Sequence, residues 1–308
     1  MNILYKTTVN RSIGDDMALI GTRSLVTKVV GEHNAFIYDV GKDMREKINE
    51  MLAQGKEIRS DVWHWKRKVK IDLVVVAGTP VWTGPEMEEL EYYVLANNVP
   101  VLYMGVGTTS GASEKTKSVL KQCVGFIARD DTALNTARKF GKEGKKICCP
   151  SIFSLSPKSE LGNRVGVVVQ TDTDFDGQRS LIGRYMPGQV LLIAHHIEDY
   201  EILAQEYEGY MIRYSRYLYD LRGFYIQCNQ IYSARIHGAH LAFGLAIPVV
   251  CIKNTVKKSE VCKTIEVKVV DPRQATEDDL IDSVRERATA NERWKEYKEY
   301  MSQCLNLN

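Results

Sequence analysis

The residues best suited to chemistry stand in one short segment, Ser233-Ala234-Arg235-Ile236-His237-Gly238. Arginine offers a planar set of donors that fits carboxylate or phosphate groups, and histidine can donate a proton near neutral pH. The pattern predicts a strand ending near Ser233 and a small-residue helix beginning near His237. Arg235 and His237 should then lie in a strand-to-helix turn, where unpaired N–H groups and the helix dipole favour an anion.

A purely structural interpretation of this segment is also open. His237 would cap the helix, and Arg235 would pair with an acid on the surface. Three polar side chains at an otherwise apolar junction are costly to bury without a use. This cost favours the interpretation as a site.

Two other patterns indicate weaker alternatives. His195, His196 and Asp199 resemble a metal set, but adjacent strand residues point to opposite faces, so the two histidines cannot easily share one ion. The run from Gly105 through Gly107 to Gly111 has the spacing G-x-G-x-x-x-G and lacks an acidic partner, which argues against a dinucleotide site. We therefore predict no metal and no cofactor.

Aromatic residues gather in two further places. The segment 63–68 combines two tryptophans with basic residues and would suit an anionic carrier lipid or a sugar polymer. The stretch 207–219 holds five tyrosines, whose rings suit sugar faces. Packing onto a sheet or a helix explains either cluster equally well, so both interpretations stay open.

The elements that must position these residues alternate regularly along the chain. Short β-branched runs predict strands over 3–9, 35–40, 71–77, 99–104, 123–128, 146–149, 164–170, 190–195, 209–213, 230–233, 248–252 and 266–270. Amphipathic stretches predict helices over 15–30, 42–54, 86–97, 113–121, 131–140, 198–206, 214–221, 237–245 and 277–303. This order is typical of doubly wound parallel sheets, which bind ligands at the carboxyl ends of their strands.

A polar stretch over 150–163, with Pro150, Pro157 and Gly162, predicts a domain boundary. We expect an N-terminal α/β domain over 1–155 and a C-terminal α/β domain over 156–308. The last helix has no strand after it and could cross back to the first domain. The fold class predicted is two Rossmann-like doubly wound domains facing across a cleft.

Length and composition describe an ordinary globular protein. The 308 residues are 44% hydrophobic and 26% charged, which favours two domains with substantial cores. A net charge of +2 argues against a nucleic-acid partner, which usually needs a strongly basic face. Seven cysteines without a C-x-x-C pair predict reduced thiols.

Targeting signals are not evident in the sequence. The first eleven residues lack the organisation of a signal peptide. The longest apolar stretch, near 241–252, is too short to span a bilayer and contains Pro248. We expect a cytoplasmic protein with at most peripheral membrane contact.

Several motifs in order resemble the polysaccharide pyruvyl transferase family. The segment from Ser233 to Gly238, a Pro-led strand and then a lysine (Lys257 or Lys258) resemble its C-terminal signature. Upstream, three segments resemble its N-terminal motifs in the expected order: Gly14-Asp15-Asp16, the strand into the glycine loop at 98–107, and Arg129-Asp130. The resemblance spans about residues 14–258.

The resemblance implies a reaction and roles. The family moves the pyruvyl group of phosphoenolpyruvate onto two sugar hydroxyls as a cyclic ketal, with release of phosphate. Arg129 and Arg235 would hold the anionic donor, and His237 would protonate its methylene carbon. Contacts to substrate are expected from Gly14, Asp15, Gly78, Gly107, Ser233, Gly238 and Lys258. The N-terminal domain would form the acceptor side, and the C-terminal domain would carry the donor motif.

Two further expectations concern proton transfer. A helix N-terminus disfavours protonated His237, and a bound dianion favours it, so we expect His237 to become a good acid only with donor bound. Asp15 or Asp130 could serve as the base for the acceptor hydroxyl. Alternatively, Asp130 pairs with Arg129 or caps the next helix.

The sequence departs from the family pattern in places. The glycine cluster after the third strand appears as Ala77-Gly78-Thr79, the Asp expected near the junction is replaced around Cys149-Pro150, and Ile236 replaces the usual aromatic residue or leucine. The partners expected are phosphoenolpyruvate and a saccharide acceptor that is free, nucleotide-linked, lipid-linked or polymeric. The alternatives are a GT-B-type glycosyltransferase that uses a nucleotide sugar, and a non-catalytic protein that binds a saccharide or an anion.

Overall fold

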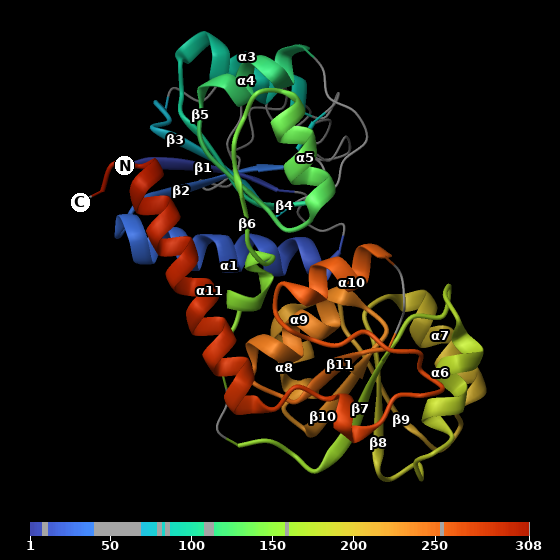
Figure 1. The fold of residues 1–308 in the computed structure, drawn as a ribbon. Helices are drawn as coiled ribbons and strands as arrows, with labels where there is room; N and C mark the ends of the chain where they lie inside the picture. Colours follow the sequence, from blue (N-terminus) through green and yellow to red (C-terminus); the bar gives the residue numbers. More distant parts are fainter. Residues whose placement is uncertain are drawn as a thin grey trace. The chain divides into compact units, whose positions relative to one another are not determined.

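The computed structural model describes residues 1–7, 12–39, 69–78, 82–83, 87–107, 114–157, 160–252 and 256–307. The chain divides into two compact units. The first contains Met1–Pro150 and Trp294–Asn308, and the second contains Ser151–Arg293. Each unit holds one parallel sheet with helices on both faces (Figure 1), which confirms the predicted fold class of two α/β domains.

The sheet of the first unit has the strand order β2-β1-β3-β4-β5-β6, and every neighbouring pair is parallel. Its central strands are apolar along their whole length, as expected for strands covered on both faces. The strands are β1 (Asn2–Thr7), β2 (Asn34–Asp39), β3 (Leu73–Ala77), β4 (Val101–Val106), β5 (Cys123–Ala128) and β6 (Lys145–Lys146).

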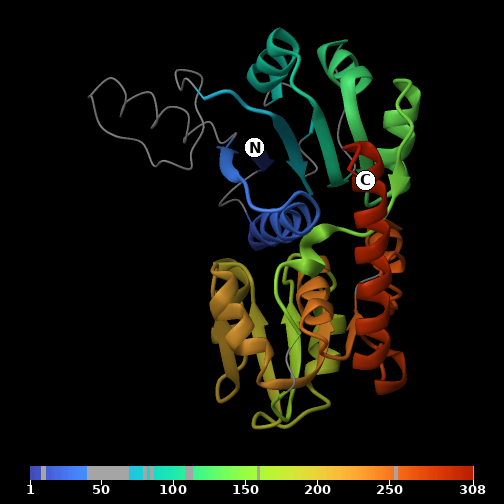
Figure 2. The same cartoon turned by 90° about the vertical axis from the view of Figure 1, so that its left-hand side faces the viewer.

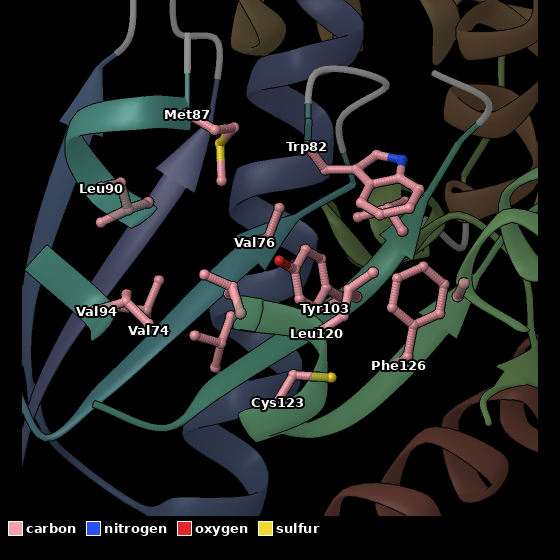
Figure 3. Packing of buried hydrophobic residues seen from close by; sticks show 14 of the residues in the cluster. Val74, Val76, Trp82, Met87, Leu90, Val94, Tyr103, Leu120, Cys123 and Phe126 are labelled. Atoms are coloured by element: carbon pink, nitrogen blue, oxygen red, sulfur yellow. The ribbon is translucent and has the colours of Figure 1, made fainter. Parts of the chain in front are cut away.

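Three helices cover one face of this sheet: α3 (Glu88–Asn97), α4 (Glu114–Gln122) and α5 (Asp131–Lys139). The core beneath them contains the rings of Trp82, Tyr103 and Phe126, which meet edge-to-face or tilted with centroids 5.2–5.7 Å apart (Figure 3). The Trp82 indole nitrogen donates to the Gly107 carbonyl over 2.7 Å. The ring cluster therefore holds the backbone of Gly107, directly after β4.

Helix α1 (Ile13–Val30) and the end of α11 (Ser283–Cys304) also pack on the sheet of the first unit. The Tyr297 hydroxyl donates to the Cys148 carbonyl over 2.6 Å. A Cβ at Gly125 would lie 2.6 Å from the Cys304 sulfur, so the glycine allows the helix to come close. Figure 2 shows α11 as one continuous helix.

The sheet of the second unit has the order β11-β10-β7-β8-β9, and its neighbours are again parallel. Its strands are β7 (Arg164–Val169), β8 (Val190–Ala194), β9 (Met211–Tyr214), β10 (Cys228–Ser233) and β11 (Val249–Cys251). Its helical segments are η2 (Pro150–Phe153), α6 (Phe175–Ile182), α7 (Ile197–Glu206), α8 (Leu218–Tyr225), α9 (Ile236–Gly244), α10 (Val256–Lys263) and η3 (Glu277–Asp279).

Helices α6 and α7 share one apolar cluster with β7, β8, β10 and β11, through residues such as Leu181 and Leu203. Helix α9 contacts β10 and β11, and α8 contacts β10. A Cβ at Gly244 in α9 would lie 2.5 Å from the Ile152 carbonyl oxygen, so the small residue admits η2 closely. The strand ends of β7, β8 and β10 meet at one edge, as parallel strands require.

Several elements differ from the sequence prediction. Helices α6 and α10 were missed; the first begins in a run rich in Asp and Gly, where Asp174 accepts from the Gly177 N–H and so caps the helix. The helix expected over 214–221 lies at Leu218–Tyr225. The strand expected over 266–270 is a single bridge between Val269 and Cys251.

The long helix expected over 277–303 is interrupted. A 3-10 turn, Glu277–Asp279, is followed by an extended stretch in which the Ile281 N–H donates to the Val249 carbonyl over 3.1 Å. Helix α11 begins only at Ser283. The buried Ile281 forms an antiparallel bridge with β11, and this bridge interrupts the helix.

Some predictions fall outside the described residues: the helix over 42–54, the cluster at 63–68 and the glycine-loop end at 108–111. Among the helices that the structure describes, none has the length and apolar character needed to cross a membrane. All seven cysteines are free thiols, and six of them are buried.

Candidate active site

The turn between β10 and α9 is built by Ser233. Its hydroxyl donates to the Arg235 carbonyl over 2.8 Å and accepts from the Arg235 N–H over 3.3 Å. Ser233 is fully buried. The sequence prediction gave it a substrate contact, whereas its geometry supports a role in holding the backbone that presents Arg235.

Arg235 is fixed on two sides of its guanidinium group. Nε donates to the Val169 carbonyl over 3.3 Å, and Nη2 forms an ion pair with Asp199. No hydrogen bond from Nη1 to the described part of the chain is found, and the side chain is 18% exposed. Arg235 thus keeps a donor edge for a ligand while its orientation is set by protein groups.

Asp199 is the residue that holds this arginine, and its side chain is 3% exposed. One carboxylate oxygen binds Arg235, and the other accepts from both the N–H and the hydroxyl of Thr171, each over 2.9 Å. Asp199 stands in the first turn of α7, and Thr171 follows β7. The network therefore joins the ends of β7, β8 and β10.

Helix α9 begins directly after its N-cap residue Arg235, and no side chain in the described part of the chain caps it. His237 lies in that turn and is half-buried. Its ring lies 5.8 Å from that of His240, which is fully buried and whose Nδ1 lies 2.8 Å from the Ser151 hydroxyl. An imidazole and an uncapped helix N-terminus together suit an anion that must be protonated or stabilised.

A second histidine lies behind this turn. His195 follows β8, and its Nε2 lies 2.9 Å from the Tyr225 hydroxyl. Burial lowers the pKa of His195 well below its usual value, and the charges of Arg235 and His237 lower it further. Burial also holds the pKa of Tyr225 well above 10. The pair is therefore uncharged at neutral pH.

Gly238 is required by packing. A Cβ at this position would lie 2.4 Å from the Ser233 hydroxyl, 2.9 Å from Val168 and 3.1 Å from the Tyr225 hydroxyl. Any larger residue would push on the group that shapes the Arg235 turn. Gly238 thus supports the turn, which is a different role from the substrate contact predicted for it.

In the first unit, Arg129 follows β5 and is 7% exposed. Its Nη1 donates to the Gly78 carbonyl over 3.0 Å and contacts the Cys149 sulfur at 3.5 Å. Its Nε is buried without a hydrogen-bond partner, and no carboxylate pairs with Arg129 among the described residues. A buried cation held by neutral groups is well suited to an anionic ligand.

Gly78 and Gly107 flank this arginine. A Cβ at Gly107 would lie 2.6 Å from Arg129 Nε, so only glycine leaves room for the side chain. Gly78 has a φ of +53°, and a Cβ there would lie 2.6 Å from the Ala18 Cβ. Both predicted glycines therefore shape the surroundings of Arg129.

The remaining predicted residues of the first unit lie at helix starts. Gly14 and Asp15 are in the first turn of α1, where the Ser12 hydroxyl donates to Asp15 over 3.0 Å. Asp130 accepts from the Ala133 N–H over 2.8 Å and so caps α5. This contact supports the capping interpretation of Asp130.

The predicted residues thus fall into two groups. The first unit brings Gly78, Gly107 and Arg129 together, and the second brings Ser233, Arg235, His237 and Gly238 together. Lys258 lies in α10, and its side chain is outside the described residues.

Sequence reasoning missed Thr171, Tyr225 and His240, and it considered Asp199 only as part of a metal set and not as the partner of Arg235. Asp199 carried a usable signal, because it stands four residues before Leu203 in a helix. That spacing places it on the buried face of α7. A buried acid at a helix start needs a partner, and Arg235 was available.

Comparison with known proteins agrees with the residue pattern. A sequence model described as polysaccharide pyruvyl transferase matches residues 13–255. The chain belongs to this family. Comparison with curated proteins finds no match.

Solved structures similar to this pyruvyl transferase family member share its fold. One is the UDP-GlcNAc 2-epimerase of Neisseria meningitidis bound to UDP-GlcNAc, with 10% identity, a TM-score of 0.55, and coverage of 99% of this chain and 96% of that one. Another is the enzyme of Methanocaldococcus jannaschii in complex with UDP-GlcNAc and UDP, with 9% identity, a TM-score of 0.51, and coverage of 100% and 99%. At such identities the likeness shows the two-domain Rossmann-like fold alone.

Proposed function

We propose that this protein transfers the pyruvyl group of phosphoenolpyruvate onto two hydroxyls of a saccharide, which forms a cyclic ketal and releases phosphate. The observation that carries the proposal is the Arg235 turn. A buried carboxylate fixes the arginine beside an uncapped helix N-terminus, and His237 lies in the same turn. Membership of the pyruvyl transferase family supports the reaction class.

The donor is strongly anionic, since it carries a carboxylate and a largely ionised phosphate at neutral pH. Arg235 offers its open Nη1 edge to one of these groups, and the first N–H groups of α9 offer further donors. We also propose Arg129 as an anion-binding group in the first unit. It is buried without a carboxylate among the described residues, so a ligand anion would compensate its charge.

His237 is proposed as the acid. It donates a proton to the methylene carbon of the donor, which leaves an oxocarbenium-like centre at the adjacent carbon. One acceptor hydroxyl adds to that carbon, the bond to the phosphate oxygen breaks, and the second hydroxyl closes the ketal. The hydroxyl protons leave to a base.

Neutral His195 has a supporting role in this scheme. A second imidazolium close to His237 would compete for the same anion and oppose protonation of His237. Burial keeps His195 uncharged, and Tyr225 holds its Nε2. Arg235 is then the fixed cation of this turn, and His237 is left as its titratable group.

The test is calorimetric titration with phosphoenolpyruvate of the wild type and of R235A, H237Q and R285A. Arg285 is the matched control, because it is an exposed arginine of the same unit, paired with Glu266. We expect saturable binding by the wild type and R285A in the micromolar-to-millimolar range usual for substrates, and its loss in R235A. H237Q should retain binding and lose turnover by about 10²–10⁴-fold.

A different pattern would overturn the proposal. If the wild type binds UDP-GlcNAc and shows no heat with phosphoenolpyruvate, the nucleotide-sugar alternative is favoured. If H237Q loses affinity for phosphoenolpyruvate and no transfer is ever detected, a non-catalytic anion-binding role is favoured.

A further inference from the structure

A patch of exposed tyrosines lies at the strand-end edge of the second unit. Tyr200 in α7 is 36% exposed, and Tyr217 just before α8 is 59% exposed. The ring of Tyr214, the last residue of β9, lies 5.9 Å from that of Tyr200 at an angle of 35°. Exposed aromatic side chains that gather on one surface are typical of binding sites.

Arg216 contacts the ring of Tyr217. Its guanidinium carbon lies 5.2 Å from the centre of the Tyr217 ring, and Nη2 donates to the Tyr217 hydroxyl over 3.0 Å. The hydrogen bond to Tyr217 raises the pKa of Arg216, and the nearby Tyr214 phenol raises it further. Tyr200 and Tyr214 are thus in ring contact, and Arg216 and Tyr217 form a second pair two and three residues after Tyr214; these four residues are called here the tyrosine patch.

The tyrosine patch adjoins the Arg235 turn. Tyr200 directly follows Asp199, so one residue of α7 holds Arg235 from the buried side while the next is exposed. Strands β8 and β9 are adjacent and parallel, so His195 and the residues after Tyr214 lie at the same sheet edge.

We infer that the tyrosine patch binds the saccharide acceptor and holds a sugar unit of it beside the Arg235 turn. The identity of the ligand rests on the proposed function. Tyrosine rings offer flat apolar faces to the C–H groups of a pyranose, and their hydroxyls can bond to sugar hydroxyls. Arg216 orients the Tyr217 ring and adds donors at its edge.

The chemistry of the tyrosine patch favours a sugar over a second copy of the chain. Each of its rings carries a hydroxyl, and the only aliphatic side chain next to them on α7 with large exposure is Ile197, at 41% among the described residues. Interfaces between protein copies are also rich in tyrosine and arginine, but their buried centre is usually more apolar. A hydrated, hydroxyl-bearing ligand fits these groups better.

The experiment uses a glycan array of glucose, galactose, N-acetylglucosamine and uronic acid oligosaccharides, without phosphoenolpyruvate. The proteins are the wild type, Y200A, Y217A and the control Y92A. Tyr92 is a matched control, since it is 62% exposed in the first unit and has the Lys115 ammonium 4.0 Å above its ring. We expect wild type and Y92A to bind the same glycans, and Y200A and Y217A each to lose roughly tenfold in affinity.

Titration of the same variants with phosphoenolpyruvate separates this inference from the proposed function. Unchanged donor affinity with weakened glycan binding supports the acceptor role of the tyrosine patch. Glycan binding that depends on Tyr200 and Tyr217, with no donor binding by the wild type, supports the patch and overturns pyruvyl transfer. Circular dichroism spectra of Y200A and Y217A that match the wild type verify that both variants are folded.

Two results would overturn the inference. The first is an absence of glycan binding by the wild type, or equal binding by all four proteins. The second is an oligomeric wild type that dissociates in Y217A during sedimentation, because the tyrosine patch would then be covered by a second copy of the chain.

Discussion

The turns after β5 and after β10 each place an arginine between a parallel strand and a helix, but they hold it in different ways. Arg129 is buried and bound by a carbonyl and a thiol. Arg235 is more exposed and bound by a carboxylate that is itself buried. The charge of Arg235 is thus compensated within the protein, whereas that of Arg129 is not compensated by any described residue.

The helices that follow the two arginines, α5 and α9, differ in how their N-termini are capped. Helix α5 is capped by Asp130, whose carboxylate occupies the place of an anion at the helix start. Helix α9 has no side-chain cap among the described residues, and His237 lies in its first turn. The helix start is thus filled by a protein carboxylate after Arg129, whereas no described side chain fills it after Arg235.

The two turns therefore distribute charge differently. At the Arg235 turn the protein neutralises the cation and leaves the helix N-terminus open, which fixes geometry and leaves room for an anion. At the Arg129 turn the protein fills the helix N-terminus and leaves the cation uncompensated. An anionic ligand would bind the helix end in one case and the guanidinium in the other.

The largest expected effect is on the free energy of unfolding, and it differs between variants of the two arginines. In R235M the carboxylate of Asp199 stays buried and loses its cation, so we expect the free energy of unfolding to fall by about 3–5 kcal/mol. R129M removes a buried charge that lacks a carboxylate, so we expect a loss of at most about 1 kcal/mol, or a gain. Urea unfolding followed by circular dichroism measures both.

A double variant is the control for this contrast. R235M/D199L removes the stranded carboxylate and should recover part of the stability lost in R235M. Equal losses in R235M and R129M would show that the two arginines are held alike, contrary to the comparison.

The amino-acid sequence predicted most strands and helices in their correct order, because the strands are continuous apolar runs and the helices between them are amphipathic. It also located the Arg235 turn, because polar residues stood out at an apolar junction. It could not connect Asp199, Thr171 or Tyr225 to this turn, because they lie 10 to 64 residues from Arg235 in the chain and are brought near it only by the strand order. The order β11-β10-β7-β8-β9 is set by packing over the whole sheet, which local patterns do not encode.

The roles assigned to small residues were also beyond the sequence. The family resemblance implied substrate contacts for Ser233 and Gly238, and these contacts stay predictions. In the structure a Cβ at Gly238 would meet the Ser233 hydroxyl at 2.4 Å, and that hydroxyl is committed to the backbone of Arg235. Only three-dimensional distances separate a residue that touches the ligand from one that shapes the turn.

A second prediction compares paired and unpaired carboxylates within the second unit. Glu286 in α11 is fully buried, and neither of its oxygens has a hydrogen-bond partner in the described part of the chain. Burial, with a smaller contribution from Asp282, raises its pKa to about 10. Asp199 is equally buried and has Arg235 and Thr171 as partners.

The raised pKa of Glu286 makes stability depend on pH. The folded state keeps the proton while the unfolded chain, with a pKa near 4.5, releases it. Stability is therefore full below about pH 4.5 and falls as pH rises toward 10, by up to about 1.4 kcal/mol per pH unit. We expect E286Q to raise the free energy of unfolding by roughly 2–3 kcal/mol at pH 7 and to remove this decline.

Thermal unfolding of E286Q between pH 5 and pH 9 measures the effect. E292Q is the control, because Glu292 is an exposed glutamate of the same helix. If the melting temperature declines with pH as steeply in E286Q as in the wild type, Glu286 is not the group responsible for the decline.

The smallest expected effect concerns the cap of α5. In D130A the helix loses the side chain that accepts from the Ala133 N–H, which should lower the free energy of unfolding by about 1 kcal/mol. The N-terminus of α5 is then open beside Arg129, as that of α9 is open beside Arg235. Inorganic phosphate should accordingly raise the melting temperature of D130A more than that of the wild type. D131A is the control, since Asp131 is exposed and pairs with Lys146 without capping the helix. An equal phosphate response in D130A and D131A would mean that the Asp130 carboxylate does not fill an anion position. The contrast between the two turns would then rest on the arginines alone.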